Sequence, residues 1–175
     1  MVMKIRVGTS DDIKEIDICN RAVLPENYDY DYYFGTFEKD HCCYVLVNDN
    51  NSKQNSNTDV DLGIDKVYGY ILGYRETHDP SVMNLMSFGI LPECQKQNWG
   101  KKLLQAFFED IKTKNQNATN KDIVIIKNVG LSVRKTNKRA QKLYKKAKFG
   151  FVRNDKDYYG KGHDGLLMIK TFPSI

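Results

Sequence analysis

The sequence predicts a single α/β domain in which helices pack on a mixed β-sheet. Its 175 residues are enough for one domain that buries roughly two-thirds of its unfolded surface. Apolar residues recur at helical spacing in some segments and form short continuous runs in others, and the two kinds of segment alternate along the chain. The resulting order of elements is βααββ(β)αβαββ, with a strand–loop–helix unit in the middle.

The N-terminal segment predicts a short strand and two helices. Residues 4–7 form the strand. The side chain of Thr9 then caps a helix, and the side chain of Asp12 can accept a bond from the backbone N–H of Thr9, which completes a capping box. Pro25 ends this helix, because proline lacks the N–H that a helix interior needs. The aromatic residues within 28–34 begin a second, shorter helix.

The middle of the chain predicts three strands and one long loop. The apolar run 42–47 is the first of these strands. Segment 48–65 is polar and rich in asparagine, which is typical of a flexible connection. Strands 66–76 and 82–91 are too apolar to have one face in water, so we expect them at the centre of the sheet.

The C-terminal half predicts two helices and three strands. An apolar stripe at every fourth residue, formed by Trp99, Leu103, Phe107 and Ile111, marks the first helix. The remaining elements are a buried strand at 122–133, a helix whose inner face carries Ala140, Leu143, Tyr144 and Ala147, and final strands at 148–154 and 164–172.

Composition argues against membrane, secreted and metal-binding proteins. No apolar run approaches the length that a bilayer requires, and no leader precedes the first strand, so we expect a cytoplasmic protein that could also enter the nucleus. The four cysteines form no CxxC pair and the three histidines are scattered, so we predict reduced, mostly buried cysteines and no metal site.

The net charge of +5 is concentrated in one segment, 134–148. Its positive field could attract phosphate, RNA or an acidic partner. The one aromatic residue of this segment, Tyr144, is expected on the inner face of the helix, so no aromatic side chain is placed among the lysines to stack on bases. We therefore interpret most of this segment as a solvated helix face, and nucleic acid as an indirect partner at most.

The stretch "QKQNWGKKLL", residues 95–104, has the outline of a phosphate-binding turn that opens a helix. Unpaired backbone N–H groups and the positive end of the helix dipole attract phosphate at such a turn. Asn98 stands where glycine is usual, and asparagine is the other residue that readily adopts the left-handed conformation. We therefore predict a working phosphate loop.

This loop and the order of elements resemble the GCN5-related N-acetyltransferase (GNAT) family over essentially the whole chain. The motifs are Gln95-x-x-Asn98-x-Gly100 and the helix from Asn137 to Tyr144. Within the family, "LPENYDYDYYF", "LSVRKTNKRAQKLY" and "DYYGKGHDGLLM" are most similar to the catalytic subunit of N-terminal acetyltransferase A. The resemblance implies the family's mixed, mostly antiparallel sheet. It also implies direct acetyl transfer from acetyl-CoA to the α-amine of a nascent or free polypeptide.

The resemblance also assigns the cofactor site. A backbone N–H on the strand ending "SFGI" would stabilise the oxyanion. Gly89 would either let that strand kink and leave the group unpaired, or be tolerated there for packing. Tyr144 either packs in the core or protonates the departing thiolate. The cofactor-binding residues expected are Phe88, Gly89, Ile90, Gln95, Lys96, Gln97, Asn98, Trp99, Gly100, Lys101, Asn137 and Tyr144.

Two loops are expected to hold the peptide. Glu26 matches a residue that positions the amine or helps to remove its proton. The gripping walls would be Leu24, Pro25 and Tyr28 from one loop and Tyr158 and Tyr159 from the other. Related enzymes carry a histidine at the position of Ser132, so the identity of the general base stays open.

The resemblance implies two further partners, an elongated helical auxiliary subunit and the ribosome. Three alternatives stay open. One is an enzyme that prefers a retained N-terminal methionine, which Ser132 disfavours. Another is an acetyltransferase of lysine or small amines, which tyrosines on both sides of the cleft disfavour. The third is a non-catalytic acyl-CoA-binding adaptor, suggested by Asn98 and Ser132.

Overall fold

The computed structural model describes residues 2–49, 65–118 and 123–172. Their strands are β1 (Met3–Val7), β2 (His41–Asn48), β3 (Val67–Arg75), β4 (Val82–Ile90), β5 (Asn128–Arg134), β6 (Gly150–Asp155) and β7 (Gly165–Thr171). Their helices are α1 (Ile13–Val23), α2 (Tyr30–Phe37), α3 (Trp99–Asn117) and α4 (Lys138–Lys146), with 3-10 turns at Ser10–Asp12 and Pro92–Cys94.

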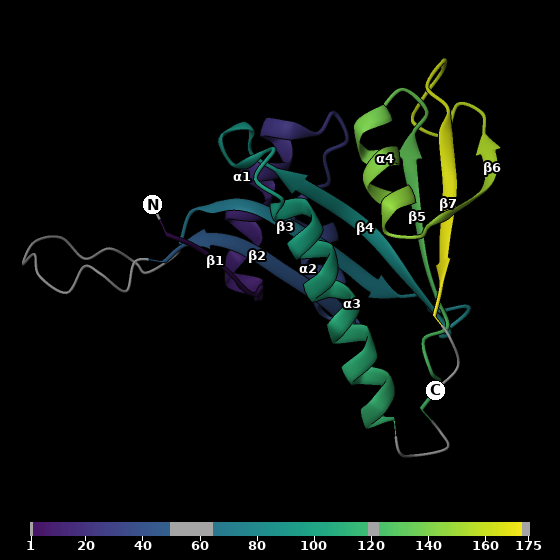
Figure 1. The fold of residues 1–175 in the computed structure, drawn as a ribbon, viewed down its shortest axis with the longest axis horizontal. Coiled ribbons are helices and arrows are strands. Elements are labelled where there is room, and N and C mark those ends of the chain that lie inside the picture. Colours follow the sequence, from purple (N-terminus) through teal and green to yellow (C-terminus); the bar gives the residue numbers. More distant parts are fainter. Residues whose placement is uncertain (1, 50–64, 119–122, 173–175) are drawn as a thin grey trace, which may run out of the picture.

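These strands form one sheet in the order β1-β2-β3-β4-β5-β7-β6 (Figure 1). Every neighbouring pair is antiparallel except β4 and β5, which run parallel. The predicted mixed sheet and the predicted order of elements are confirmed. The two apolar strands β3 and β4 lie at its centre, as expected.

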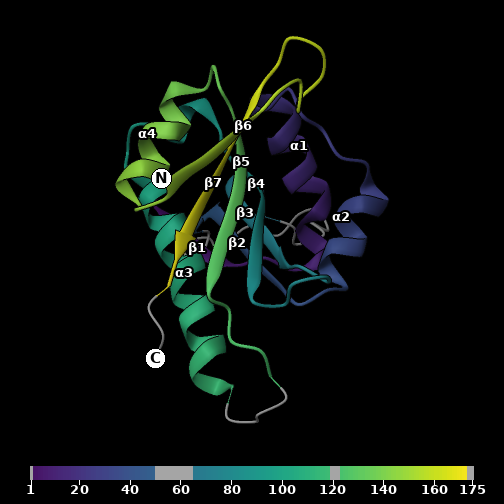
Figure 2. The same cartoon turned by 90° about the vertical axis from the view of Figure 1, so that its right-hand side faces the viewer.

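Helices cover both faces of the sheet (Figure 2). One core lies under α1 and α2, where Ile13 and Ile16 pack against Tyr70 and Leu72 of β3. The other lies under α3 and α4 and includes Leu46, Ile71, Met83, Leu103, Phe107, Ile111 and Tyr144. Because side chains alternate along a strand, the central strands contribute to both cores. The apolar stripe predicted for the helix after the phosphate loop is confirmed.

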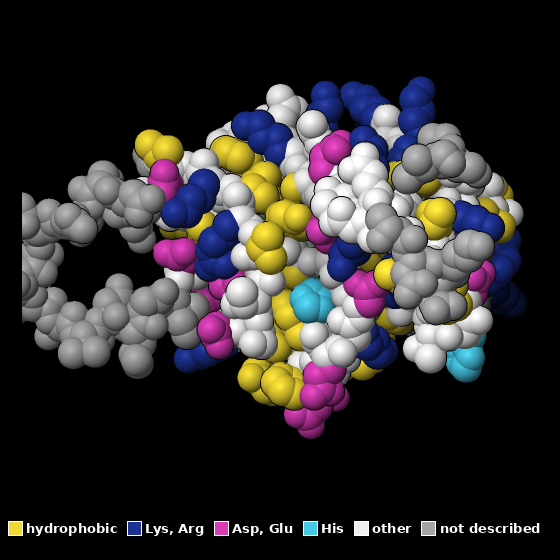
Figure 3. Space-filling view, turned by 90° about the horizontal axis from the view of Figure 1, so that it is seen from below, with side chains coloured by type: hydrophobic (Ala, Val, Ile, Leu, Met, Phe, Trp, Pro, Cys, Tyr) yellow, Lys and Arg dark blue, Asp and Glu magenta, His cyan; other side chains and the backbone are white. Residues whose placement is uncertain are grey.

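The strand expected over 122–133 is shorter than the sequence suggested. In the described part of this segment, β5 begins only at Asn128, and residues 123–125 are exposed. Asn128 pairs with Val82, the first residue of β4, so the residues before it lie beyond the end of the neighbouring strand. Elsewhere too, hydrophobic side chains reach the surface among charged ones, as the face seen from below shows (Figure 3).

Four further predictions concern the asparagine-rich segment, the cysteines, membrane-spanning helices and metal sites. Most of the asparagine-rich segment 48–65, namely 50–64, lies outside the described residues. All four cysteines are buried and unpaired, as expected. No described helix is both long and apolar enough to cross a membrane. Within the same residues, no three His, Cys, Asp or Glu side chains gather where they could hold a metal ion.

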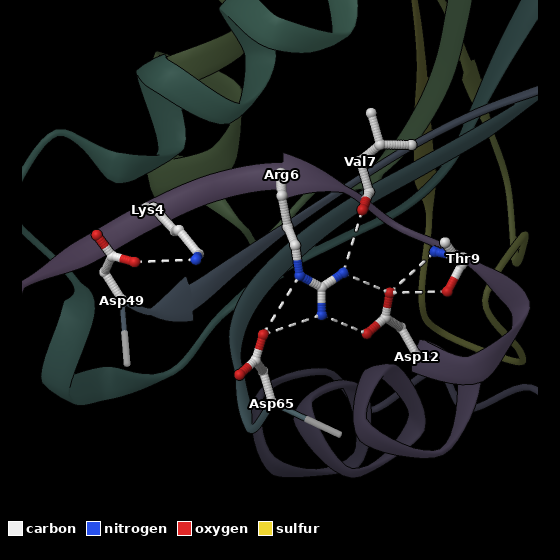
Figure 4. A network of polar contacts seen from close by, with 7 residues as sticks. All are labelled: Lys4, Arg6, Val7, Thr9, Asp12, Asp49 and Asp65. Atoms are coloured by element: carbon white, nitrogen blue, oxygen red, sulfur yellow. Dashed lines mark hydrogen bonds and ion pairs between the residues drawn. The ribbon is translucent and has the colours of Figure 1, made fainter. Parts of the chain in front are cut away.

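A charged network fixes the start of α1 against β1 (Figure 4). Arg6 donates two hydrogen bonds of 2.8 Å to the carboxylate of Asp12, which is almost fully buried. The backbone N–H of Thr9 donates to the same carboxylate at 2.9 Å, so the predicted capping box is present. Burial alone would raise the pKa of Asp12, but the bonds from Arg6 and Thr9 hold it below its ordinary value.

A second polar cluster fixes the end of α1 against the sheet. The side-chain amide of Asn20 donates to the Tyr70 hydroxyl at 2.7 Å and to the Ser87 hydroxyl at 3.2 Å. The two hydroxyls are 2.6 Å apart, and all three side chains are buried. Hydrogen bonds of this kind are directional, so the cluster fixes the last turn of α1 against β3 and β4.

The Asp12 network predicts a stability difference between two aspartates of the same region. Asp12→Asn removes a buried ion pair and should lower the free energy of unfolding by about 2–3 kcal/mol at pH 7. Because the pKa of Asp12 is depressed on folding, its contribution is present above about pH 4 and is lost as the pH falls further. Asp17→Asn removes a surface pair with Arg21 and should cost less than about 0.5 kcal/mol. Urea unfolding at pH 7 and pH 3 measures both, and equal losses in the two variants would contradict the assignment.

Candidate functional site

The site is built on the separation of β4 from β5. The two strands pair only through Val82, Met83 and Asn84 on one side and residues 128–130 on the other. Beyond these pairs β4 continues to Ile90 and β5 diverges from it (Figure 1). Both strands therefore leave backbone groups without a strand partner on the sides that face each other.

Two of these groups are the N–H groups of Phe88 and Ile90. The N–H of Leu91 donates to the Tyr68 carbonyl of β3 at 2.8 Å. Because backbone groups alternate along an antiparallel pair, Phe88 and Ile90 turn theirs away from β3 and into the opening. The Ile90 carbonyl there accepts a 2.8 Å bond from the side-chain amide of Gln95. The N–H groups can bind a developing negative charge.

Of the two roles left open for Gly89, a kink or packing, the structure fits packing. It pairs regularly with Tyr70, and the irregularity of β4 lies at Met86, which has no register partner in β3. A Cβ atom at Gly89 would come within 2.9 Å of the Tyr70 ring and of Val23. The unpaired groups arise from the divergence of two strands, which a single-strand pattern does not show.

A cleft of about 940 Å³ opens between the end of β4, α3 and α4. Leu24 of the expected peptide side lines it, and Gln97 does not, since its amide bonds the Glu93 carbonyl at 2.9 Å. All other residues expected to bind the cofactor line it, namely Phe88, Gly89, Ile90, Gln95, Lys96, Asn98, Trp99, Gly100, Lys101, Asn137 and Tyr144.

The loop before α3 has the backbone of an anion-binding turn. Asn98 adopts the left-handed conformation with φ 64° and ψ 6°, as expected for a residue that replaces glycine in such a turn. Lys96 adopts the same φ, which the sequence did not indicate. The Asn98 side chain does not cap α3, so the first N–H groups of the helix stay available. Lys96 and Lys101 add positive charge along the cleft, and the group as a whole fits a phosphate ester.

Trp99, the only tryptophan in the sequence, leaves a donor without a partner in this loop. Its indole N–H is buried and forms no hydrogen bond within the described residues. The Lys102 ammonium lies 4.1 Å from the centre of its ring. A buried unpaired donor is costly.

Arg139 was missed by the sequence reasoning, which placed it on a solvated face. Its guanidinium donates to the side-chain carbonyl of Gln95 and so ties the first turn of α4 to the phosphate loop. Asn137 caps the same turn as expected, accepting a 3.0 Å bond from the Ala140 N–H. The sequence did contain one signal for this position, because Arg139 stands two residues after the predicted helix cap Asn137 and so lies in the first turn of the helix.

Tyr144 packs in the core and also borders the cleft. Its ring packs 5.6 Å from Phe149 and 6.5 Å from Phe88, so it belongs to the core. It also lines the cleft. Burial raises the pKa of Tyr144 well above its ordinary value, so the hydroxyl keeps its proton at physiological pH.

Glu26 is not an ordinary exposed glutamate, because it forms an ion pair with Arg134 at the end of β5. Both side chains are about three-quarters buried. The Arg134 guanidinium lies 5.1 Å from the centre of the Tyr159 ring. Arg134, which the sequence reasoning counted only as part of the basic segment, therefore joins both expected peptide-binding loops.

The tyrosines of the two loops lie near this pair. Burial raises the pKa of Tyr28, and Tyr158 and Glu26 raise it further. Burial also raises the pKa of Tyr159, with added effects from Tyr158, Glu26 and Tyr28. Such mutual effects require proximity, so the structure brings these expected substrate residues together. Pro25 is exposed, and of the expected substrate residues only Leu24 lines the cleft itself.

Asp164 holds the loop that carries Tyr158 and Tyr159. Its carboxylate accepts bonds from the Asn154 amide, the Asp157 N–H and the Lys135 ammonium at 3.1, 3.2 and 3.1 Å. These bonds lower the pKa of Asp164. The loop is thus fastened to the connection between β5 and α4, which begins directly after Arg134. The sequence reasoning missed this residue.

Comparison with known proteins agrees with this geometry. The model of the acetyltransferase (GNAT) family matches residues 11–151. An N-alpha-acetyltransferase of Sulfolobus acidocaldarius is 32% identical over 174 residues, covering 94% of this chain and 90% of the relative.

Two solved structures share the fold at low sequence identity. The first is Arabidopsis thaliana NAA60 in complex with acetyl-CoA, with a TM-score of 0.73 and 18% identity over 98% of this chain and 99% of that one. The second is the NatC complex bound to Gag peptide and CoA, with a TM-score of 0.76 and 15% identity over 99% of this chain and 100% of that one.

The left-handed backbone of Asn98 predicts how its variants bind acetyl-CoA. Asn98→Gly should bind at least as tightly as the wild type, because glycine adopts this conformation freely. Asn98→Val should strain the loop by about 1–2 kcal/mol and weaken binding roughly 5- to 30-fold. Titration of Trp99 fluorescence measures both, and Gln97→Val serves as the control outside the cleft. Wild-type affinity in Asn98→Val would contradict the role of the loop.

Proposed function

The chain belongs to the acetyltransferase (GNAT) family, and from this premise we propose that it is a peptide Nα-acetyltransferase. It transfers an acetyl group from acetyl-CoA to the α-amine at the N-terminus of a polypeptide. The relative from Sulfolobus acidocaldarius, similar over nearly the whole chain, supports this choice of amine.

The observation that carries the proposal is the meeting of two loops at Arg134, beside the cleft. Arg134 binds Glu26 of the loop after α1 and stacks on Tyr159 of the loop before β7. A polypeptide end needs walls on two sides and polar groups between them. Tyrosine provides both contact area and a hydrogen-bonding tip, which suits an extended backbone.

Acetyl-CoA supplies the acetyl group as an activated thioester. The left-handed loop at Lys96 and Asn98 and the free N–H groups of α3 would hold its phosphates. The N–H groups of Phe88 and Ile90 would bind the oxygen that becomes negative during transfer. These groups are already oriented by the sheet, so little reorganisation is needed.

The amine must reach the acetyl group without its extra proton. Glu26 attracts the cationic N-terminus to the site, while the positive charge of Arg134 beside it favours the neutral amine over the ammonium form. None of the three histidines lines the cleft. Glu26 does not line the cleft either, but it is the carboxylate that lies between the two expected peptide-binding loops. We therefore propose that Glu26 accepts the proton, directly or through water.

Tyr144 is the proposed donor to the departing thiolate, because its hydroxyl is protonated and its side chain lines the cleft. The transfer is direct. Cys94 also lines the cleft, but burial raises the pKa of its thiol, and a protonated thiol is a poor nucleophile.

We also propose an auxiliary subunit that docks on α1 and α2. These helices expose Ile18, Tyr30 and Phe34, and the rings of Tyr30 and Phe34 stack with their centres 6.4 Å apart. Exposed apolar side chains of this kind are typical of a binding surface. Acetylation of nascent chains would place the protein in the cytoplasm and at the ribosome.

Mass spectrometry of acetyl transfer tests the function. The purified chain should acetylate the α-amine of peptides that begin with Ser, Ala, Glu or Met-Leu, and the preferred peptide defines the subfamily. Spermine and a peptide with only an internal lysine amine should remain unmodified, since neither presents an extended peptide end to the two loops.

The outcomes separate the alternatives. Transfer to spermine or lysine alone would overturn the proposal. Transfer to no amine, even with an auxiliary subunit added, together with normal acetyl-CoA binding, would favour an adaptor without catalytic activity.

Tyr144→Phe should lower kcat about 100-fold, the usual contribution of a general acid. Its acetyl-CoA affinity and stability should change little, because the hydroxyl forms no hydrogen bond within the described residues. Since burial raises the pKa of Tyr144, ionisation of its hydroxyl should cause no loss of wild-type activity up to about pH 10. Tyr44→Phe, outside the cleft, is the matched control. Steady-state kinetics from pH 6 to pH 10 decide the role, and an unchanged kcat in Tyr144→Phe would assign Tyr144 to packing alone.

A further inference from the structure

The positive charge of the chain comes from one short segment. Residues 134–148 contain eight basic residues and no acidic one. Without those eight, the 27 basic residues fall to 19, against 22 acidic ones, and the rest of the chain carries a net charge of −3. Positive charge is therefore concentrated around α4, whereas the rest of the chain is net negative.

The structure divides the basic residues of α4 between two directions. Arg139 and Lys146 line the acetyl-CoA cleft. Lys138, Lys142 and Lys145, spaced as i, i+4 and i+7, form a stripe on the opposite side of the helix from its buried face, and none of them lines that cleft. We call these three residues the lysine stripe. All three are exposed.

The lysine stripe has no counter-charge on the protein. Among the described residues, no carboxylate forms an ion pair with any of its three ammonium groups, whereas the neighbouring Lys135 is paired with Asp164. Like charges four residues apart on a helix repel each other. A ligand that brings several negative charges to this face relieves the repulsion.

We propose that the lysine stripe binds the phosphate backbone of folded RNA, and this rests on the proposed acetylation of nascent chains, which grow on an RNA-rich particle. Single-stranded RNA is disfavoured, because the stripe carries no aromatic side chain for stacking on bases. A membrane is disfavoured, because the apolar residues of α4, such as Leu143 and Tyr144, face the core. Lysines alone match a phosphate backbone, which needs charge and no specific shape.

The location fits the proposed activity. The lysine stripe begins four residues after Arg134, which joins the two peptide-binding loops. RNA held on the outer face of α4 would therefore lie beside the entrance for the peptide, while the cofactor cleft on the other side of the helix stays open.

The test is binding of a labelled RNA hairpin by fluorescence anisotropy at several salt concentrations between about 50 and 200 mM. The triple variant Lys138→Gln, Lys142→Gln, Lys145→Gln should bind at least about tenfold more weakly at the lowest salt. The slope of log affinity against log salt should fall by about 2–3. Its acetylation of a free peptide should stay within about twofold of the wild type, because the stripe lies outside the cleft.

A control variant with the same charge change, Lys14→Gln, Lys66→Gln, Lys127→Gln, should keep the wild-type RNA affinity and slope. Equal losses in both variants would overturn the lysine stripe as the site. Absence of RNA binding by an active enzyme would overturn this inference alone, as would stripe-dependent binding to anionic vesicles or polyglutamate in place of RNA. Absence of acetylation by the wild type would count against the proposed function, whatever the RNA result.

Discussion

Three residue pairs join β4 to β5, and the site depends on the sheet having no more than these. Parallel strands that paired along their whole length would fill the opening with their own hydrogen bonds. Here the strands diverge, and each is followed by a helix whose N-terminus lies at the same edge of the sheet. The positive ends of α3 and α4, the unpaired N–H groups of β4 and the cleft therefore gather at one place.

Much of the fold could be predicted because it follows from local periodicity. The apolar spacing of Trp99, Leu103, Phe107 and Ile111 describes α3 completely, and the left-handed Asn98 followed from the turn that a phosphate loop requires. The run of apolar residues after 122 misled, because apolar character alone does not say whether a neighbouring strand extends far enough to pair with it. Whether such a segment becomes a strand depends on its neighbours in the folded sheet, which the local sequence does not show.

The sequence predicted those features of the candidate site that lie within a single segment of the chain. The phosphate loop and the cap at Asn137 are of this kind. Arg134 and Asp164 were missed because their partners lie far away in sequence, and a pairing such as that of Arg134 with Glu26 exists only after three segments have come together. The same limit explains Gly89, whose close contacts are with Tyr70 and Val23 of other elements.

The cluster of Asn20, Tyr70 and Ser87 gives the loop after α1 a fixed base. Apolar packing alone would tolerate small sliding of the helix, whereas directional bonds to two strands do not. A rearrangement of residues 24–29 therefore changes the conformation of the loop, while α1 keeps its position on the sheet. Glu26 lies beyond this fixed base, so an adjustment of the loop changes the position of its carboxylate, and through Leu24 also the wall of the cleft, while α1 stays in place.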